Sequence, residues 1–156
     1  MDIIRRLRGT FLLHATVWTR GFLSQLAFGV SAICFDESGR VLLARPRFGA
    51  GWGLPGGGVG AGEPPEAAIL RELAEEVGLQ SSEPPRLVGL YTRRLAWATN
   101  VIALYAVAAA QIEFAPNFEI SEICWADPVA PPPGTDPGCV RRLAEFAGLA
   151  APSHYW

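Results

Sequence analysis

Three glutamates stand three and four residues apart near the middle of the chain. Glu72, Glu75 and Glu76 belong to the stretch RELAEEVG, which runs from Arg71 to Gly78. On a helix these carboxylates fall within roughly 100° of one another. Because like charges four residues apart destabilise a helix by ~0.2–0.5 kcal/mol per pair, their crowding favours a bound counter-charge. Oxygen ligands of this kind are those that hard divalent cations such as Mg²⁺ prefer.

The alternative is an ordinary solvated acidic helix face. Between Glu63 and Glu76 the chain has five acidic residues against one arginine, a local balance of −4, whereas a face selected only for solubility would more often alternate its charges. A loop with eight glycines also directly precedes the helix, between Gly49 and Gly62. Its backbone can bend sharply or approach a ligand closely. Both features favour the metal site over the solvated face.

The helix that must position these glutamates has clear ends. Pro64 and Pro65 suit its first turn and Gly78 suits its C-terminal stop. Apolar residues gather on the side opposite the acids and should pack on a sheet. They are Leu70, Leu73, Ala74 and Val77.

Strands are expected on both sides of this helix. Residues 22–36 predict one or two strands, and 41–47 predict the return strand of a hairpin after the turn 36–40. Further strands are expected at 86–94, 100–114 and 119–128, and a final helix at 139–149, opened by Asp136 and Pro137. Strands around one central helix, closed by a second helix, indicate a mixed α/β sandwich.

The composition limits the class of protein. The chain has 156 residues, of which 50% are hydrophobic and 18% charged, so one globular domain is expected. A net charge of −2 gives neither a nucleic-acid footprint nor a membrane-seeking surface. Three widely spaced cysteines without a C-x-x-C pair favour a reducing compartment over disulfides or a zinc site. We therefore expect a cytoplasmic protein.

From Gly57 onward the sequence GGVGAGEPPEAAILRELAEEVGL resembles the Nudix box, with every fixed position filled through Leu79. The stretches GWGLPGGG before it and EISEICWADP after it are also similar to that family, so the resemblance covers roughly residues 27–128. It implies a Nudix-type α/β/α sandwich with a mixed central sheet, within a single domain over 1–156 with its core at 21–150.

The resemblance also implies an activity and a metal site. It implies a metal-dependent pyrophosphohydrolase that cleaves the diphosphate of a nucleoside diphosphate linked to another moiety, using Mg²⁺ or Mn²⁺. The implied metal ligands are Glu72, Glu75, Glu76 and the carbonyl of Gly56. Arg71 would orient the glutamates. Glu63 would bind metal indirectly or brace the loop.

The general base stays open between three carboxylates. Glu76 or Glu75 could take the proton of the attacking water, and so could Glu119, which otherwise is an ordinary residue at a strand end. Glu122 is less favoured. A degenerate domain that only senses a nucleotide would usually have lost glutamates of the box, and this chain has lost none.

Substrate contacts are expected from arginines and aromatic residues near the glycine loop. Arginine suits phosphate recognition, and aromatic faces stack on nucleobases; surface or core packing is the alternative for each. The candidates are Arg45, Arg47, Arg93, Arg94, Trp52 and Trp97. The expected partner is a small nucleotide-type substrate, with capped RNA left open and no other nucleic acid expected.

The first twenty residues lie outside the resemblance. Residues 2–19 predict an amphipathic helix that packs on the domain or on a second subunit. A homodimer would suit such a helix by analogy with the family. Its arginines and aromatic residues also fit a segment that tethers the protein to a membrane surface or to a partner. Such a tethered module is the third functional hypothesis, beside an enzyme and a non-catalytic sensor.

Overall fold

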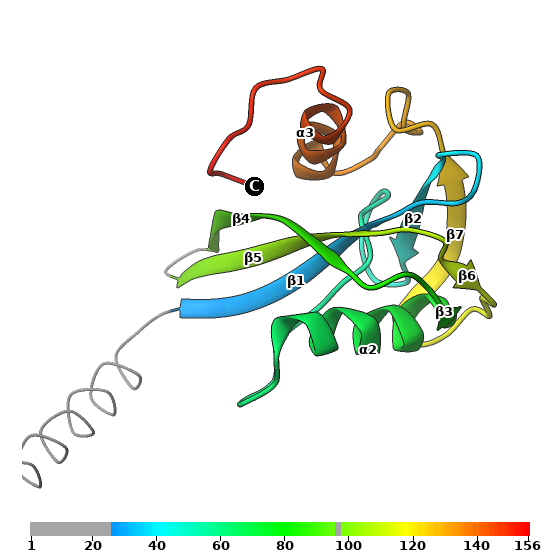
Figure 1. The fold of residues 1–156 in the computed structure, drawn as a ribbon, viewed down its shortest axis with the longest axis horizontal. Coiled ribbons are helices and arrows are strands. Elements are labelled where there is room, and N and C mark those ends of the chain that lie inside the picture. Colours follow the sequence, from blue (N-terminus) through cyan, green and yellow to red (C-terminus); the bar gives the residue numbers. More distant parts are fainter. Residues whose placement is uncertain (1–25, 96–97) are drawn as a thin grey trace, which may run out of the picture.

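A mixed sheet with the strand order β1-β5-β4 occupies the centre of the protein (Figure 1). The computed structural model describes residues 26–95 and 98–156. β1 (Leu26–Cys34) runs parallel to β5 (Ala98–Val107), and β5 pairs antiparallel with β4 (Arg86–Leu95). The expected hairpin of the two later strands and the mixed character of the sheet are therefore confirmed.

Two shorter strand pairs form separate two-stranded sheets. β2 (Val41–Pro46) pairs antiparallel with β7 (Ile120–Ala126), and β3 (Leu79–Ser81) pairs antiparallel with β6 (Gln111–Ile112). The pairing of β2 with β7 brings the loop before β7 beside the glycine-rich loop that follows β2.

The expected hairpin between residues 22–36 and 41–47 is wrong. The turn itself forms, because Asp36 Oδ1 accepts hydrogen bonds from the N–H groups of Ser38 and Arg40, each at 2.9 Å. Beyond the single bridge Phe35–Val41, however, β1 pairs with β5 and β2 pairs with β7. Both strands are apolar on both faces, and each pairs with a strand far along the chain instead of with the other.

α2 (Pro65–Val77) is the expected central helix. Pro64 precedes it with an extended backbone, and Gly78 ends it in the left-handed region at φ 73°. A side chain at Gly78 would also place its Cβ 2.2 Å from the carbonyl oxygen of Glu113, so only glycine fits there. Leu73 and Val77 are fully buried against the sheet.

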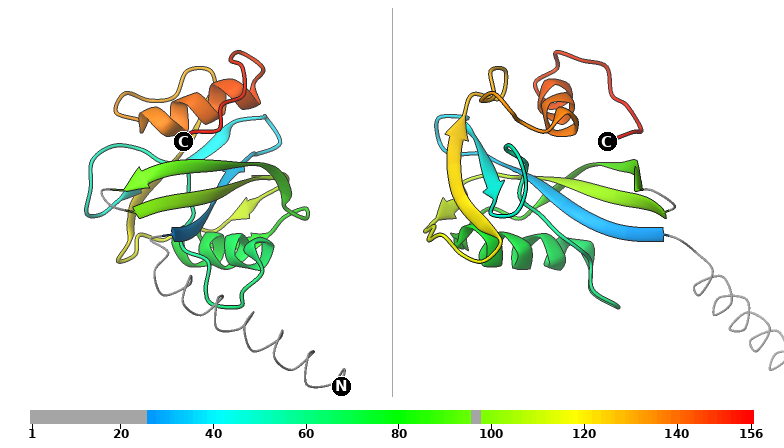
Figure 2. Two further views of the ribbon diagram at one scale, coloured as in Figure 1. Left: turned by 90° about the vertical axis from the view of Figure 1, so that its left-hand side faces the viewer. Right: turned by 180° about the vertical axis from the view of Figure 1, so that it is seen from behind.

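α3 (Pro137–Phe146) covers the other face of the sheet (Figures 1 and 2). Asp136 caps it by accepting a hydrogen bond from the N–H of Cys139 at 3.1 Å. One core lies between the sheet and α2, and a second, containing Leu143 of α3 and Ile33 of β1, lies on the opposite side. The α/β/α sandwich is therefore confirmed.

The expected N-terminal amphipathic helix at 2–19 lies outside the described residues. Within 26–95 and 98–156, the structure has no helix long and apolar enough to span a bilayer.

Candidate metal and substrate site

Arg71 joins the acidic residues of α2 to the loop before it. Its Nε donates to Glu63 Oε1 at 2.9 Å, and its Nη1 donates to Glu72 Oε1 at 2.8 Å and Glu75 Oε2 at 3.2 Å. Its Nη2 reaches the carbonyl oxygen of Gly58 at 3.0 Å. Hydrogen bonds from this guanidinium lower the pKa of Glu63 to about 2. Arg71 therefore contacts two of the three glutamates of the box, and the orienting role that the resemblance implies for it stays a prediction.

Glu72 lies directly against the backbone of the glycine-rich loop. A Cβ built on Gly57 would stand 2.3 Å from Glu72 Oε2, so a side chain at that position would displace the carboxylate. The side chain of Glu72 is 12% exposed. The first glycine of the box is thus explained by the space that Glu72 occupies.

Glu76, in the last turn of α2, contacts the same glycine-rich loop. Its Oε2 accepts a hydrogen bond from the N–H of Gly56 at 2.8 Å. Gly56 has φ 144°, and a Cβ there would lie 2.2 Å from the carbonyl oxygen of Val30. Burial, aided by the charges of Glu72 and Glu119, raises the pKa of Glu76 to about 7 despite the hydrogen bond from Gly56.

Glu119 shares a cavity of about 310 Å³ with Glu76 and Gly56. This cavity lies between the end of β2, the start of β7 and the glycine-rich loop, so residues more than forty positions apart in the sequence face the same space. The fold thus brings together Glu76 and Glu119, two of the three candidates for the general base.

Asn117, which sequence reasoning did not single out, connects Glu119 to α2. Its Nδ2 donates to the carbonyl oxygens of Glu76 at 2.9 Å and Glu75 at 3.3 Å, which α2 leaves without helical partners. Its Oδ1 accepts from the N–H groups of Glu119 at 3.0 Å and Ile120 at 2.8 Å. The sequence signal was the stretch PNFEI, where asparagine favours such a turn before a strand.

The donor chemistry of this site fits a hard divalent cation, because it consists of carboxylate and carbonyl oxygens. Among residues 26–95 and 98–156, however, no group of three acidic, histidine or cysteine side chains forms a ready-made metal cage. The reason is local: Arg71 holds Glu72 and Glu75, whereas Glu76 binds the N–H of Gly56. The ligand roles of the three glutamates and of the Gly56 carbonyl therefore stay predictions.

A larger cavity of about 420 Å³ adjoins the same loop. Gly53, Leu54 and Gly56 line both cavities, so the two meet along the glycine-rich segment. The larger one also has polar side chains from four different elements, together with an apolar wall. They include Ser31 of β1, Arg93 of β4, Asn100 of β5 and Asp136 at the start of α3.

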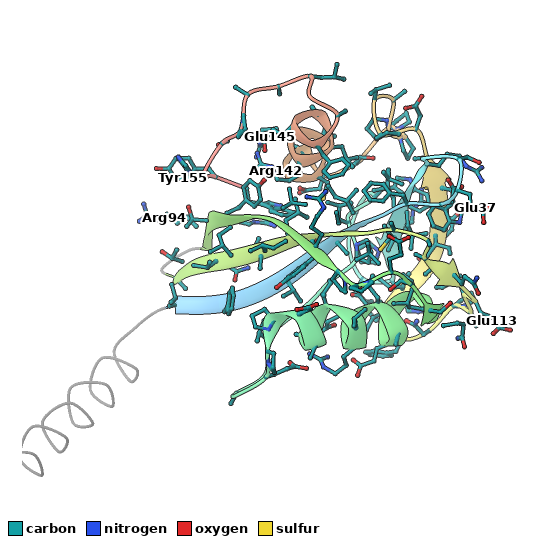
Figure 3. All side chains as sticks on the ribbon, viewed as in Figure 1. Glu37, Arg94, Glu113, Arg142, Glu145 and Tyr155 are labelled. Atoms are coloured by element: carbon teal, nitrogen blue, oxygen red, sulfur yellow. The ribbon has the colours of Figure 1, made fainter. Side chains whose placement is uncertain are left out.

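The structure separates the predicted arginines into different environments. Arg93 lines the larger cavity, while Arg94, its neighbour on β4, is not among the residues that line it and is exposed at the end of the strand (Figure 3). Arg47 donates from Nε to the carbonyl oxygen of Asn117 at 2.7 Å, and its N–H donates to Glu119 O at 2.7 Å. Arg47 thus braces the loop that holds Glu119.

Arg45 and Trp52 pack on each other instead of facing either cavity. The guanidinium of Arg45 lies 4.3 Å from the ring centroid of Trp52, and its Nη1 is 3.1 Å from Glu122 Oε2. Trp52 is 7% exposed and belongs to the core under α3. This geometry favours a packing role over base stacking for Trp52. Trp97 lies outside the described residues.

Comparison with known proteins agrees with the arrangement of these elements. Residues 25–145 match the family model described as NUDIX domain. The MutT NUDIX hydrolase from Burkholderia pseudomallei is similar in structure, with a TM-score of 0.68 and 26% sequence identity, over 78% of this chain and 98% of that one.

Two curated relatives are named RNA pyrophosphohydrolase. The protein from Shewanella sediminis is 45% identical over 69 residues, which is 44% of this chain and 37% of its own. The protein from Gluconacetobacter diazotrophicus is 43% identical over 58 residues, 31% of this chain and 35% of its own. The chain thus spans about a third of the length of these relatives.

Proposed function

Because this chain belongs to the NUDIX domain family, we propose that it is a metal-dependent pyrophosphohydrolase. Its substrate is a nucleoside diphosphate linked to another moiety, and the bond it hydrolyses is the phosphoric anhydride. The observation that most supports this proposal is that Glu76 and Glu119 face one cavity beside the loop where Glu72 and Arg71 are held.

The acidic site needs a cation before it can accept a diphosphate. A substrate of this charge would be repelled by Glu72, Glu75 and Glu76 alone. Bound Mg²⁺ or Mn²⁺ would supply charge neutralisation and would polarise the phosphoryl oxygens and the attacking water. Glu72, Glu75, Glu76 and the Gly56 carbonyl are the groups that would hold it. Arg71 keeps these carboxylates in position by pairing with two of them.

The general base that takes the proton of the attacking water would be a carboxylate of the smaller cavity. Glu76 and Glu119 both line it, whereas Glu75 is 60% exposed at its side chain. A base within hydrogen-bond reach of the water contributes about 10²–10⁴-fold to a rate. The geometry thus favours Glu76 or Glu119 over Glu75 as the base.

The nucleoside part of the substrate fits the larger cavity. Arg93 can donate hydrogen bonds, Asp136 can accept them, and Asn100 can do both, so a base or ribose finds partners there. The loop Gly53–Gly56 lies between this cavity and the carboxylates, so a linked diphosphate would cross it. Glycine allows the backbone to approach the phosphates closely.

One panel of substrates tests the proposal. The protein with Mg²⁺ or Mn²⁺ is incubated with nucleoside triphosphates, dinucleoside polyphosphates, nucleotide sugars, NADH, and RNA with a capped or triphosphate 5′ end. The RNA is included because the curated relatives are named RNA pyrophosphohydrolase. We expect metal-dependent release of a phosphate-containing product from at least one class.

The variants Glu75→Gln, Glu76→Gln and Glu119→Gln separate the roles of the carboxylates. Substitution of the general base should lower kcat the most and flatten the dependence of kcat on pH. Substitution of a metal ligand should raise the metal concentration needed for half-maximal rate. Turnover of no substrate, or turnover that none of the three variants changes, would refute the proposal. Binding of a nucleotide without turnover would favour a sensor instead. Homodimerisation stays a prediction that light scattering of the full chain tests.

A further inference from the structure

Residues 150–156 lie beside the outer edge of the mixed sheet. The N–H of Thr92 on β4 donates to the carbonyl oxygen of His154, and the N–H of Trp156 donates to the carbonyl oxygen of Thr92, each at 2.9 Å. The segment therefore pairs with β4 in parallel through Thr92 and Tyr155. This pairing covers polar backbone groups that an edge strand otherwise leaves open.

α3 holds the same segment from the other side. Arg142, which is fully buried, donates from Nη1 to the carbonyl oxygen of Tyr155 and from Nη2 to Glu145 (Figure 3). Glu145 Oε1 also accepts from the N–H of Ser153 at 3.1 Å. Arg141 Nη2 donates to the main-chain oxygen of Trp156 at 2.6 Å. A buried charge needs such partners, so these contacts specify where the segment lies.

These contacts seat the indole of Trp156 at the start of α3. A Cβ on Gly138 would stand 2.5 Å from Trp156 Cδ1 and 2.6 Å from its Nε1, so the pyrrole edge of the indole lies against the helix backbone and needs glycine there. Tyr91 meets it edge to face, with ring centroids 6.1 Å apart. Trp156 is half-buried and lines the larger cavity with Arg93, Asn100 and Asp136.

We propose that Trp156 is the residue on which the nucleobase of the substrate stacks in the larger cavity, and that Arg142 is the positioning residue that sets it there through the main chain of residues 153–156. The inference rests on the proposed function, since it assumes a nucleotide-type substrate. It explains why a segment beyond α3 is held by a buried arginine: of the two aromatic side chains among the described residues that line the cavity, Phe28 comes from β1 and Trp156 from this segment.

Stacking makes a distinctive demand on the substrate. Its strength grows with the area of the ring, so a purine should depend on Trp156 more than a pyrimidine does. A ligand that has the diphosphate but no base should not depend on it at all. Arg93, Asn100 and Asp136 can then select among bases by their hydrogen bonds.

Calorimetric titration of the full chain with Mg²⁺ tests this in the hydrolysis-impaired Glu76→Gln background. ADP, UDP and inorganic pyrophosphate are the probes. Trp156→Ala should raise the Kd of ADP by about 5- to 150-fold, the range found for base–aromatic stacking. It should raise the Kd of UDP less and leave that of pyrophosphate unchanged. Trp156→Phe should restore most of the ADP affinity.

Tyr155→Ala is the matched control. Tyr155 is an aromatic neighbour in the same segment, is 73% exposed and is held by its main-chain oxygen, so its loss should leave all three affinities unchanged. If Trp156→Ala does not fold, Trp156→Leu, which keeps apolar contact with Gly138, should give the same order of effects. In steady-state assays of the otherwise unmodified protein, Trp156→Ala should raise KM for a purine substrate and leave kcat nearly unchanged.

Two failures can be told apart. If the parent protein binds ADP and Trp156→Ala binds it as tightly, or loses ADP and pyrophosphate equally, the stacking inference is overturned and the proposed function stands. If the protein without any substitution neither binds nor hydrolyses a nucleotide, both fall together.

Discussion

Two arginines, one on each face of the central sheet, are held by carboxylates in opposite ways. Arg71 on α2 has a side chain 38% exposed and bonds to Glu63, Glu72 and Glu75. Arg142 on α3 is fully buried, bonds to Glu145, and lies 4.1 Å above the ring centroid of Tyr91. The first network faces water and the second faces the core.

The difference in burial decides what each network can do. Ion pairs open to water contribute little to stability because water competes for both partners, so the acids around Arg71 can take up a metal beside it at small cost to the fold. A buried pair cannot exchange its partners without leaving a bare charge in the interior. The α2 face is therefore suited to chemistry, and the α3 face to holding residues 150–156 in one place.

The largest effect on activity is expected at Glu76. Glu76→Gln removes a predicted metal ligand and a candidate base while keeping the side chain's shape, so kcat should fall by about 10²–10⁴-fold. The circular dichroism spectrum should stay that of the parent protein. Steady-state kinetics over a range of Mg²⁺ concentrations is the measurement. Unchanged kcat would remove Glu76 from the site.

The largest effect on stability is expected at Arg142. Arg142→Leu leaves Glu145 without its cation in the core, which should lower the free energy of unfolding by about 3–5 kcal/mol. Urea denaturation measures it. The double variant Arg142→Leu, Glu145→Leu removes both charges and should lose less than Arg142→Leu alone. If the double variant is instead less stable than Arg142→Leu, an unpaired buried charge is not the cause of the loss, and the contrast drawn between the Arg142 and Arg71 networks is wrong.

Substitution of Arg71 should have the opposite effect to substitution of Arg142, with a large loss of activity and a small loss of stability. Arg71→Ala frees Glu72 and Glu75 from their orienting partner, and loss of groups that hold metal ligands typically costs about 10–100-fold in metal affinity or activity. The thermal midpoint should fall much less than it does in Arg142→Leu. Arg40→Ala is the matched control, because Arg40 pairs with Asp36 at 2.7 Å on an exposed turn far from the site; it should change neither quantity.

Asn117 should affect both properties moderately. Asn117→Ala removes two hydrogen bonds donated to the end of α2 and two accepted from the N–H groups of Glu119 and Ile120. This should lower stability by about 1–2 kcal/mol and reduce kcat by displacing Glu119. Asn117→Asp keeps the acceptor for Glu119 but loses the donor to α2. It should retain more activity than Asn117→Ala; equal losses would mean that Asn117 does not place Glu119.

The smallest effect concerns pH. The pKa of Glu63 is lowered to about 2 in the folded chain by Arg71. Its contribution to stability is therefore fully present above its ordinary pKa of about 4.5 and is lost as pH falls toward 2. Glu63→Gln should remove that part of the acid dependence of the thermal midpoint. Parallel curves for the two proteins between these pH values would contradict it.

The two faces of the sheet, covered by α2 and by α3, also differ in how much of their structure the sequence predicts. The ends of α2, the clustering of its acids and the pairing of Arg71 with Glu75 follow from spacing within one helix, because local geometry alone puts residues four apart on one face. Asn117, Arg142 and Trp156 escape such reasoning. Their partners lie on other elements, and nothing in the spacing of PNFEI or of the segment after α3 shows which element they will meet.

The hairpin prediction for residues 22–36 and 41–47 was wrong, and the role of Trp52 could not be decided from the sequence, for the same physical reason. β1 and β2 are joined by a turn of ordinary hairpin composition, yet both strands are buried and pair with distant strands. For Trp52 the sequence left base stacking and core packing open, and the structure favours packing, because Arg45 covers its ring and the core encloses it. Burial and pairing are properties of the assembled sheet, which turn chemistry and residue type do not specify.

The sequence by itself determined the central helix, its crowded carboxylates and, through the complete box, the family. These depend on neighbours within one or two helical turns or on fixed spacing along the chain. Only the tertiary structure decided that Glu119 faces Glu76, that Arg93 and not Arg94 lines the larger cavity, and that Trp156 closes its wall. Long-range strand pairing and the packing of α3 bring those residues together, and both are set by the burial of the whole sheet.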